Sequence, residues 1–494
     1  MSSPVDRLRA GAVKVARPEV VGLGIALLFA AIMGFVLAEN IISPNKRMIQ
    51  VIMAGFVLFA AFLLPSRYSV GFMVFIIPFP QYTTIGSTTV IFAFIIFAFW
   101  ILRIALGYEQ RPIRSGIEVP LICLVLFFVI SMVMVEPGQW AMAIAKFRIF
   151  ISCILIFYLV INLIRTTRDI HFILNTLVLS FGFVAVIAMV DIWMPQHASI
   201  FNFLRSRSLD MRRMTMGAGI RVGSVFGDYE LFAEYLAIYI PILLVRVLNE
   251  KIVLKQFLWL PMLGGAIMLL LATATRGAFL ALIAGVLYLI WIARHIINYQ
   301  KLLPLLIATF GLFYASAIIL NQYTETASLF ARLGETKFVK GMPDTRARRW
   351  TEAWNEIQDS PWIGHGPYYF VGVDEKNVNR LYPHSNFLFF SYLVGIPGAL
   401  VFHWMLISAG LRGYKAARRY ARQRTELAYT VVLLSSILVI FFVDEIKISF
   451  MRYDNTQHFT WTILALLLSV SRVAIARADR EEAANRERIA QRTR

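Results

Sequence analysis

Residues 88–106 read TTVIFAFIIFAFWILRIAL and hold a single charged side chain, Arg103. A helix needs roughly 17 to 25 mostly apolar residues to cross the approximately 30 Å of hydrocarbon in a bilayer. This stretch has that length and composition. We therefore expect it to be a membrane-spanning helix.

The rest of the chain repeats this pattern. Its 494 residues are 59% hydrophobic and 16% charged, and its mean hydropathy of +0.68 lies outside the range of soluble globular proteins. We predict an all-α fold: a polytopic helical membrane protein with about 12–14 transmembrane helices and a large periplasmic loop. The spans are expected at about 20–38, 48–64, 69–79, 88–106, 119–135, 141–164, 171–193, 229–248, 257–273, 277–297, 302–320, 385–411, 428–446 and 458–474.

Two long polar segments, 194–228 and 321–384, interrupt these spans. The basic segment 1–19 is expected to be a retained cytoplasmic segment, 20–474 an integral membrane domain, and 475–494 a charged cytoplasmic tail. Both cysteines, Cys123 and Cys153, fall inside expected spans. The sequence therefore predicts neither a disulfide framework nor a cysteine-based metal site.

The orientation follows from the lysines and arginines, which are enriched in short cytoplasmic loops. With both termini inside, 28 of the 48 basic residues are cytoplasmic, and 13 of the other 20 lie in the two long segments, which escape this rule. We therefore expect cytoplasmic termini and outward-facing long loops. The net charge of +19 is mostly this orientation signal, so no nucleic-acid partner is expected.

The second long loop contains a predicted helix at about 346–358. Asp344 and Thr345 offer N-cap side chains, and Asp359-Ser360-Pro361 supplies a stop. Its apolar residues recur at helical spacing, which favours a helix lying on the membrane surface. They are Trp350, Ala353, Trp354 and Ile357. The turn Gly364-His365-Gly366-Pro367 and the string Pro383-His384-Ser385-Asn386 follow.

Three side chains at expected outer positions could carry chemistry. Arg221 precedes a span, Arg276 occupies a very short turn, and His384 stands where the long loop re-enters the membrane. A guanidinium can grip phosphate oxygens with two parallel donors, and a histidine can accept a proton near neutral pH. Each also has a simpler interpretation: boundary arginines anchor to lipid phosphate, and loop histidines, such as His365 and His197, are commonly surface residues.

Four strings resemble, in order, the signatures of the O-antigen ligase and polymerase superfamily, over roughly 220–405. An R-x-G-x-F stretch leads into a span ending in Pro, an S/T-R-G-A turn opens another, a G-x-G follows a Trp-rich helix, and an H-x-N precedes a span holding G-I-x-G. Here they are RVGSVFGDYELFAEYLAIYIP (221–241), LATATRGAFLALIAG (271–285), RRWTEAWNEIQDSPWIGHGPYYF (348–370) and PHSNFLFFSYLVGIPGALVF (383–402). Where the family often has Pro-Asn after the first motif, this chain has Tyr229 and Glu230.

The resemblance implies a GT-C-like bacterial inner-membrane enzyme of lipopolysaccharide or exopolysaccharide biosynthesis. It would transfer an undecaprenyl-diphosphate-linked glycan to a glycan or lipid A core acceptor, with inversion, without metal or other cofactor. Arg221 and Arg276 would bind the diphosphate, and His384 would be a general base at the acceptor hydroxyl. Further substrate-binding candidates are Arg348, Arg349, Glu230, Asp228 and Asn386.

Several activities remain open at this stage. The resemblance does not separate a ligase from a polymerase or from a protein O-oligosaccharyltransferase, because all three use the same donor. A non-catalytic transporter or flippase is the alternative from another class. It would place charged groups at mid-membrane, for which Asp191, Glu234 and His403 are the candidates.

Overall fold

The computed structural model describes residues 65–80, 87–197, 213–216, 219–250, 253–294, 299–324, 329, 338–339, 342–368, 383–420, 426–446, 451 and 453–492. The chain divides into two compact units. Unit 1 contributes the described residues 65–69 and 98–109, and unit 2 contains 70–97 and 110–494. The helices α4 (Ser66–Ile76) and α5 (Thr88–Ala105) have residues in both units, and everything below concerns unit 2.

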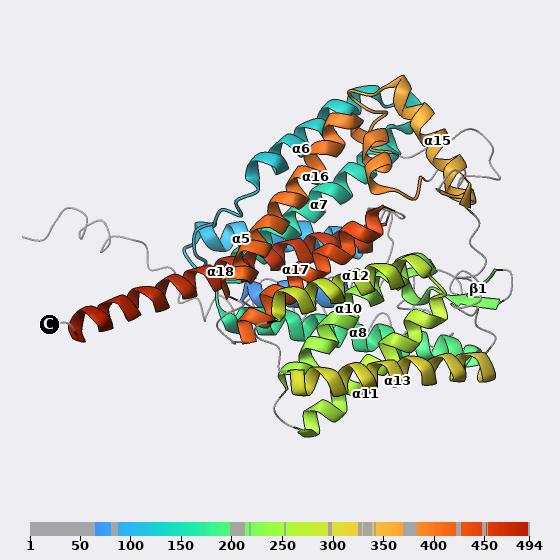
Figure 1. The fold of residues 1–494 in the computed structure, drawn as a ribbon. Helices are drawn as coiled ribbons and strands as arrows, with labels where there is room; N and C mark the ends of the chain where they lie inside the picture. Colours follow the sequence, from blue (N-terminus) through green and yellow to red (C-terminus); the bar gives the residue numbers. More distant parts are fainter. Residues whose placement is uncertain are drawn as a thin grey trace, which may run out of the picture. The chain divides into compact units, whose positions relative to one another are not determined.

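Long apolar helices make up the described part of the chain, as the composition predicts (Figure 1). Nine helices in the described ranges are long and apolar enough to cross a membrane, and two shorter apolar helices accompany them. The all-α, polytopic prediction is confirmed. In unit 2 the helices are α6 (Glu118–Ser131), α7 (Trp140–Leu163), α8 (Thr167–Trp193), α10 (Tyr229–Asn249), α11 (Val253–Thr273), α12 (Arg276–Ala293), α13 (Tyr299–Tyr323), α15 (Asp344–Asp359), α16 (Asn386–Tyr420), α17 (Glu426–Glu445) and α18 (Asp454–Arg492).

The predicted spans from 88–106 onward each coincide with one of these helices. The first two, 20–38 and 48–64, lie outside the described residues. The expected short span at 69–79 corresponds to α4, whose 11 residues end before Pro78. An 11-residue helix is only about 16 Å long, so it is too short to cross a bilayer by itself.

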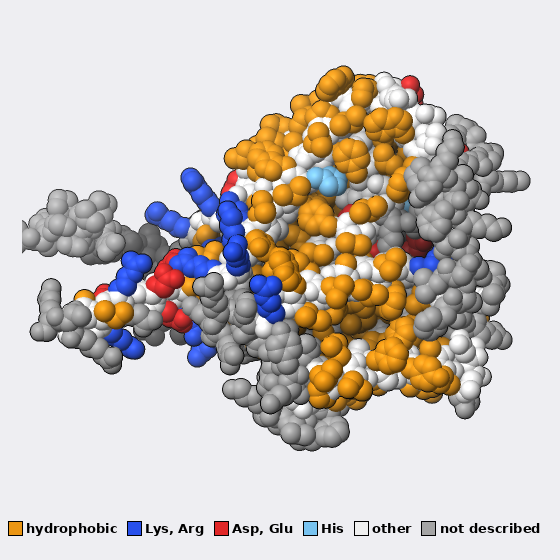
Figure 2. All heavy atoms as spheres, viewed as in Figure 1, with side chains coloured by type: hydrophobic (Ala, Val, Ile, Leu, Met, Phe, Trp, Pro, Cys, Tyr) orange, Lys and Arg blue, Asp and Glu red, His pale blue; other side chains and the backbone are white. Residues whose placement is uncertain are grey.

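Successive spans run in opposite directions, which gives unit 2 two ends. At one of these ends, α8, α11, α13 and α17 terminate and α10, α12, α16 and α18 begin. We call it the His384 end. The opposite one, where α7, α10, α12 and α16 end, is the Arg412 end. Figure 2 shows lysines and arginines gathered where α16 and α18 extend, while hydrophobic side chains cover the spans. The exposed basic residues there include Lys415, Arg418, Arg419, Arg477 and Arg480.

The Gly-x-Gly turn after α15 docks onto a break in α16. Val394 and Gly395 leave helical geometry, with Gly395 at φ 76°. A Cβ on Gly395 would lie 2.4 Å from the Trp362 oxygen, and one on Gly364 would lie 2.5 Å from the Gly395 nitrogen, so only glycine fits at both positions. Three backbone hydrogen bonds join the segments: His365 N to Tyr392 O (2.8 Å), Gly366 N to Leu393 O (3.0 Å) and Ile396 N to Pro361 O (2.8 Å).

This docking fixes α15 beside the beginning of α16 (Figure 1). The helix predicted at 346–358 is therefore present, as α15 at 344–359. Ala353 and Ile357 are buried, whereas the Trp354 side chain is 41% exposed. That this helix lies on the membrane surface remains a prediction. The ring of His365 stacks on Tyr392 and its Nε2 lies 2.9 Å from the Glu356 carbonyl oxygen, so this histidine contributes to the docking.

Two short hairpins complete the described structure of the long loops. Strand β1 (Arg213–Met216) pairs antiparallel with β2 (Gly219–Val222), so that Met214 lies opposite Arg221. Strand β3 (Phe338–Val339) pairs with β4 (Met342–Pro343) directly before α15. The sequence interpretation expected only a glycine-rich segment around Arg221, and the strand was missed.

Candidate functional site

Arg221 lies on β2 and is buried, with 4% of its surface exposed. Its Nε donates to the Thr273 carbonyl (2.8 Å), and its Nη2 donates to the Ala274 carbonyl (3.1 Å) and to the Thr275 hydroxyl (3.0 Å). Its guanidinium also covers the Tyr229 ring, with Cζ 3.3 Å from the centroid. Arg221 therefore holds the turn between α11 and α12 against the start of α10.

Arg276 begins α12 on the far side of that turn. Thr275 is the N-cap residue, and Ala274 takes a left-handed conformation with φ 49°. A non-glycine residue in this region is strained, and the carbonyl contacts from Arg221 stabilise the turn. This turn places the partly exposed guanidinium of Arg276 at the N-terminus of α12, where backbone N–H groups already favour an anion.

His384 lies between two charged side chains from other elements. Its Nδ1 is 3.5 Å from Oε2 of Glu230, on the first turn of α10, and its Nε2 is in contact with Nη1 of Arg349, on α15. Since a guanidinium can only donate, Nε2 accepts and the imidazole proton belongs on Nδ1, facing the carboxylate. His384 itself has φ 47°, which turns the chain into α16.

Asp228 and Asn386 lie at helix starts beside this histidine. Asp228 is the N-cap of α10: its Oδ1 accepts from the Glu230 amide (2.8 Å) and the Leu231 amide (3.4 Å). Asn386 is the first residue of α16 and is fully buried. The side chain of Arg348 lies outside the described residues. Of the predicted substrate-binding residues, Glu230 and Arg349 contact His384.

A series of contacts and of neighbours along the chain connects the predicted catalytic residues. It runs from Thr275, beside Arg276, to Arg221, then to Tyr229, whose neighbour Glu230 approaches His384. Residues 221, 276 and 384 are far apart in sequence, yet the turn before α12, strand β2 and the starts of α10 and α16 meet at the His384 end. Their convergence on one cavity remains a prediction.

Sequence reasoning missed the supporting residues of this arrangement. Tyr229 was noted only as a departure from the family pattern, and Thr275 only as part of the turn string.

Five buried carboxylates were also not connected with this region, although each lies near a helix terminus at the His384 end. They are Asp191, Glu234, Asp444, Glu445 and Asp454. Their positions in the sequence, at the boundaries of apolar spans, were the available signal.

The family comparison covers the middle of this arrangement. The model of the O-antigen ligase family matches residues 261–403, which include Arg276, Arg349 and His384. A search of curated proteins finds no significant match. The matched segment contains three of the four strings that carry the resemblance in the sequence, and it includes α12, α13, α15 and the first half of α16. Residues 261–403 are therefore similar to the O-antigen ligase family, which supports the resemblance of the sequence strings to the O-antigen ligase and polymerase superfamily.

Proposed function

We propose that this protein transfers a glycan from undecaprenyl diphosphate to an acceptor hydroxyl at the His384 end, on the periplasmic face of the inner membrane. The family points to ligase- or polymerase-type glycosyl transfer. The observation that carries the specific proposal is the position of His384, where a carboxylate and a guanidinium from two other elements flank the imidazole.

In the proposed reaction, the protein forms no covalent bond with the substrate. The acceptor oxygen bonds to the anomeric carbon of the glycan while the bond from that carbon to the diphosphate oxygen breaks. Attack from the opposite side inverts the configuration. The hydroxyl proton passes to His384 Nε2, and the diphosphate leaves with its added negative charge. Arginine side chains can stabilise that charge without a metal ion, and Arg276, partly exposed at the N-terminus of α12, is the candidate for this role.

Arg349 has a distinct part in this proposal. Its Nη1 lies at the imidazole nitrogen that must take the proton, so the acceptor hydroxyl has to replace it there. The displaced guanidinium can then pair with the diphosphate or with an anionic group of the acceptor. Glu230 keeps the Nδ1 proton in place and stabilises the imidazolium that forms.

The transporter alternative gains no specific support from the described helices. Asp191 is two residues from the end of α8, and Glu234 is near the beginning of α10, so both lie towards the His384 end. His403 is inside α16, and its Nδ1 is 2.8 Å from the Ala399 carbonyl of its own helix. These groups form no polar path from one end to the other.

The decisive experiment is transfer by the purified protein in lipid nanodiscs. A radiolabelled undecaprenyl-diphosphate glycan is supplied alone, with lipid A core, or with a serine-containing acceptor peptide. Labelled lipid A core indicates a ligase, lengthened donor a polymerase, and labelled peptide an oligosaccharyltransferase. Excess EDTA should leave the rate unchanged. Movement of the donor across a vesicle bilayer with no new glycosidic bond would contradict the proposal and favour the flippase.

A further inference from the structure

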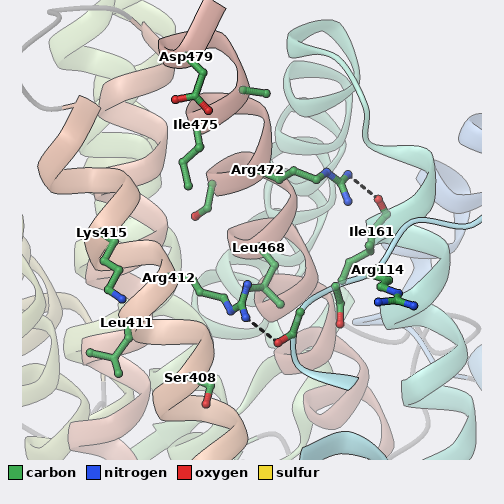
Figure 3. Close-up of a pocket in the computed structure, with 14 residues that line it drawn as sticks. Arg114, Ile161, Ser408, Leu411, Arg412, Lys415, Leu468, Arg472, Ile475 and Asp479 are labelled. Carbon is green, nitrogen blue, oxygen red and sulfur yellow. Dashed lines mark hydrogen bonds between the residues drawn. The ribbon is translucent and has the colours of Figure 1, made fainter. Parts of the chain in front are cut away.

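The Arg412 end contains a cavity of about 850 Å³, which we call the Arg412 cavity. Its walls are the loop 114–116 before α6, the last turns of α7, and the stretches of α16 and α18 around Arg412 and Arg472 (Figure 3). Arg412 lies 26 residues along α16 from Asn386, or about 39 Å at 1.5 Å per residue. The cavity is therefore separate from the candidate site.

The charge of this cavity is strongly positive. Four basic side chains line it: Arg114, Arg412, Lys415 and Arg472. Asp479 is the one carboxylate among the described lining residues, and it pairs with Arg419, 2.7 Å away, which does not line the cavity. Neither Arg114 nor Lys415 has an ion-pair partner in the part of the chain that the structure describes.

Two of the guanidinium groups are held in fixed positions. Arg412 Nη2 donates to the Gly116 carbonyl (2.8 Å), and Arg472 Nη2 donates to the carbonyls of Ile161 (2.8 Å) and Ile164 (2.7 Å), as Figure 3 shows in part. Gly116 has φ 85°, and a Cβ there would lie 2.5 Å from the Arg412 Cζ. Only glycine leaves room for this guanidinium. Each arginine keeps further donors beyond these bonds.

A buried hydroxyl also lines the cavity. Ser471 is 3% exposed, and its Oγ has no hydrogen-bond partner among the described residues. A buried polar group without a partner is costly, so such a group in a native structure calls for a ligand or a water. Next to two fixed guanidiniums, a phosphate oxygen is a suitable acceptor for this hydroxyl.

The cavity also has an apolar wall. Ile161, Leu411, Leu468 and Ile475 lie on α7, α16 and α18 in the same cavity. Free phosphate or a polar metabolite would gain nothing from these side chains. A ligand that carries an anionic phosphate next to hydrocarbon matches both kinds of wall.

We propose that the Arg412 cavity is a binding site for an anionic phospholipid, whose phosphate contacts Arg412, Arg472 and Ser471 and whose acyl chains pack on the apolar wall. Basic residues between helices at one membrane face are suited to such headgroups. Charge that only sets topology needs to be on that face, but does not need to converge on a cavity or be held there by backbone carbonyls. The inference stands whether or not the proposed transfer activity does.

The test is lipid binding to the full-length, delipidated protein, measured by native mass spectrometry as phosphatidylglycerol is titrated. The test variant is Arg114→Gln with Lys415→Gln, because both side chains are exposed and no described residue pairs with them. The control is Arg480→Gln with Arg488→Gln, which removes the same charge from exposed positions further along α18. A third variant, Ser471→Ala, removes the buried hydroxyl with little change in volume.

We expect the test pair to weaken phosphatidylglycerol binding by about tenfold and the control pair by less than about twofold, since solvent and salt screen charges that lie away from the bound headgroup. Ser471→Ala should weaken it as well, and phosphatidylcholine should bind poorly to every variant. Equal losses of phosphatidylglycerol affinity in the test and control pairs would mean that the lipid binds by general surface attraction and not in the Arg412 cavity. Inorganic phosphate that competes at similar concentration would overturn the lipid assignment in favour of a soluble phosphate.

Discussion

The two ends of unit 2 both carry arginines, but they use them differently. At the His384 end, Arg221 is buried and makes three hydrogen bonds to the turn before α12, and Arg349 contacts an imidazole that also faces a carboxylate. At the Arg412 end, most basic residues are exposed, and several have no acidic partner among the described residues. Among the described basic residues there, Arg165, Arg412 and Arg472 donate to backbone carbonyls.

This difference separates two origins of basic charge in a membrane protein. Charge that sets orientation can stay at the surface, because its partner is the membrane potential and the lipid headgroups. Charge that serves a reaction has to be positioned, and that requires strained backbone and buried partners. The left-handed conformations of Ser224, Ala274 and His384 all occur at the His384 end. A count of arginines alone would treat both ends alike.

The first prediction concerns which side of the membrane each end faces. In a Cys123→Ser, Cys153→Ser background, Trp362→Cys reports on the His384 end and Ala484→Cys on the Arg412 end; the Trp362 side chain is 74% exposed, and Ala484 is also exposed. A membrane-impermeant maleimide should label position 362 in intact spheroplasts and position 484 only after permeabilisation. Both must react in detergent. The reverse pattern would invert the proposed topology and the proposed periplasmic reaction with it.

The next largest effect is expected at Arg276. Arg276→Ala should abolish transfer without unfolding, because the leaving diphosphate loses the cation proposed to stabilise it. Arg276→Lys keeps the charge but not the paired donors, so we expect a loss of roughly 10²-fold. Arg294→Ala, at the other end of the same helix α12, is the matched control and should retain transfer. Equal losses at both positions would show that α12 needs charge at its ends only for insertion or stability.

His384→Ala should lower turnover by roughly 10² to 10⁴ if the imidazole is the general base. Donor binding should change little, because the proposed contact is with the acceptor. His403→Ala changes a histidine of the same helix whose contacts are the Ala399 carbonyl and two phenylalanine rings. Transfer assays and donor-binding titrations on both variants separate the roles. Normal turnover in His384→Ala would end the base hypothesis and leave diphosphate departure as the driving event.

The spans and α15 were predictable because their signals are local. An apolar run of sufficient length has few alternatives to a membrane helix, and the Trp350–Ile357 periodicity needs no knowledge of the rest of the chain. The docking of Gly364 on Gly395 was not predictable in the same way, although both glycines belong to quoted strings. Each string shows that a glycine is present, but not which backbone it must approach.

The same distinction between local and long-range signals applies to the site residues. Residue type and position near a span indicated Arg276 and His384. Arg221, which was expected to bind substrate, makes three hydrogen bonds to the turn before α12. Its partners are two carbonyls, and no side-chain pattern reveals which carbonyls a turn exposes. The hairpin that carries Arg221 was hidden for a similar reason: its four-residue strands are too short for an alternating pattern to stand out.

Gly395→Ala tests whether the docked turn positions the His384 end. The added Cβ would approach the Trp362 carbonyl in a left-handed conformation, which should destabilise the protein by about 2 kcal/mol or more. Thermal unfolding in detergent measures the loss. Gly311→Ala in α13 is the control, because no atom lies within 4 Å of the added carbon, and it should be neutral or stabilising. An unchanged melting temperature in Gly395→Ala would mean that the contact between turn and break is dispensable.

The smallest effect is expected at Glu230, and its neighbour Asp228 provides the comparison. Glu230→Ala removes the carboxylate facing His384 Nδ1 but no helix cap, so kcat should fall by about tenfold with little change in stability. Asp228→Ala removes the α10 cap and should lower stability by about 1 kcal/mol.

The two carboxylates are two residues apart on the same turn, so a general loss of negative charge would affect both variants alike. The decisive measurement is the double variant. If Glu230 acts through His384, Glu230→Ala should add little further loss in a His384→Ala background, because the group it orients is already gone. If the losses in kcat of the two single variants were fully additive, Glu230 would instead contact the substrate directly. The carboxylate of Glu230 and the imidazole of His384 would then act independently rather than as one coupled pair.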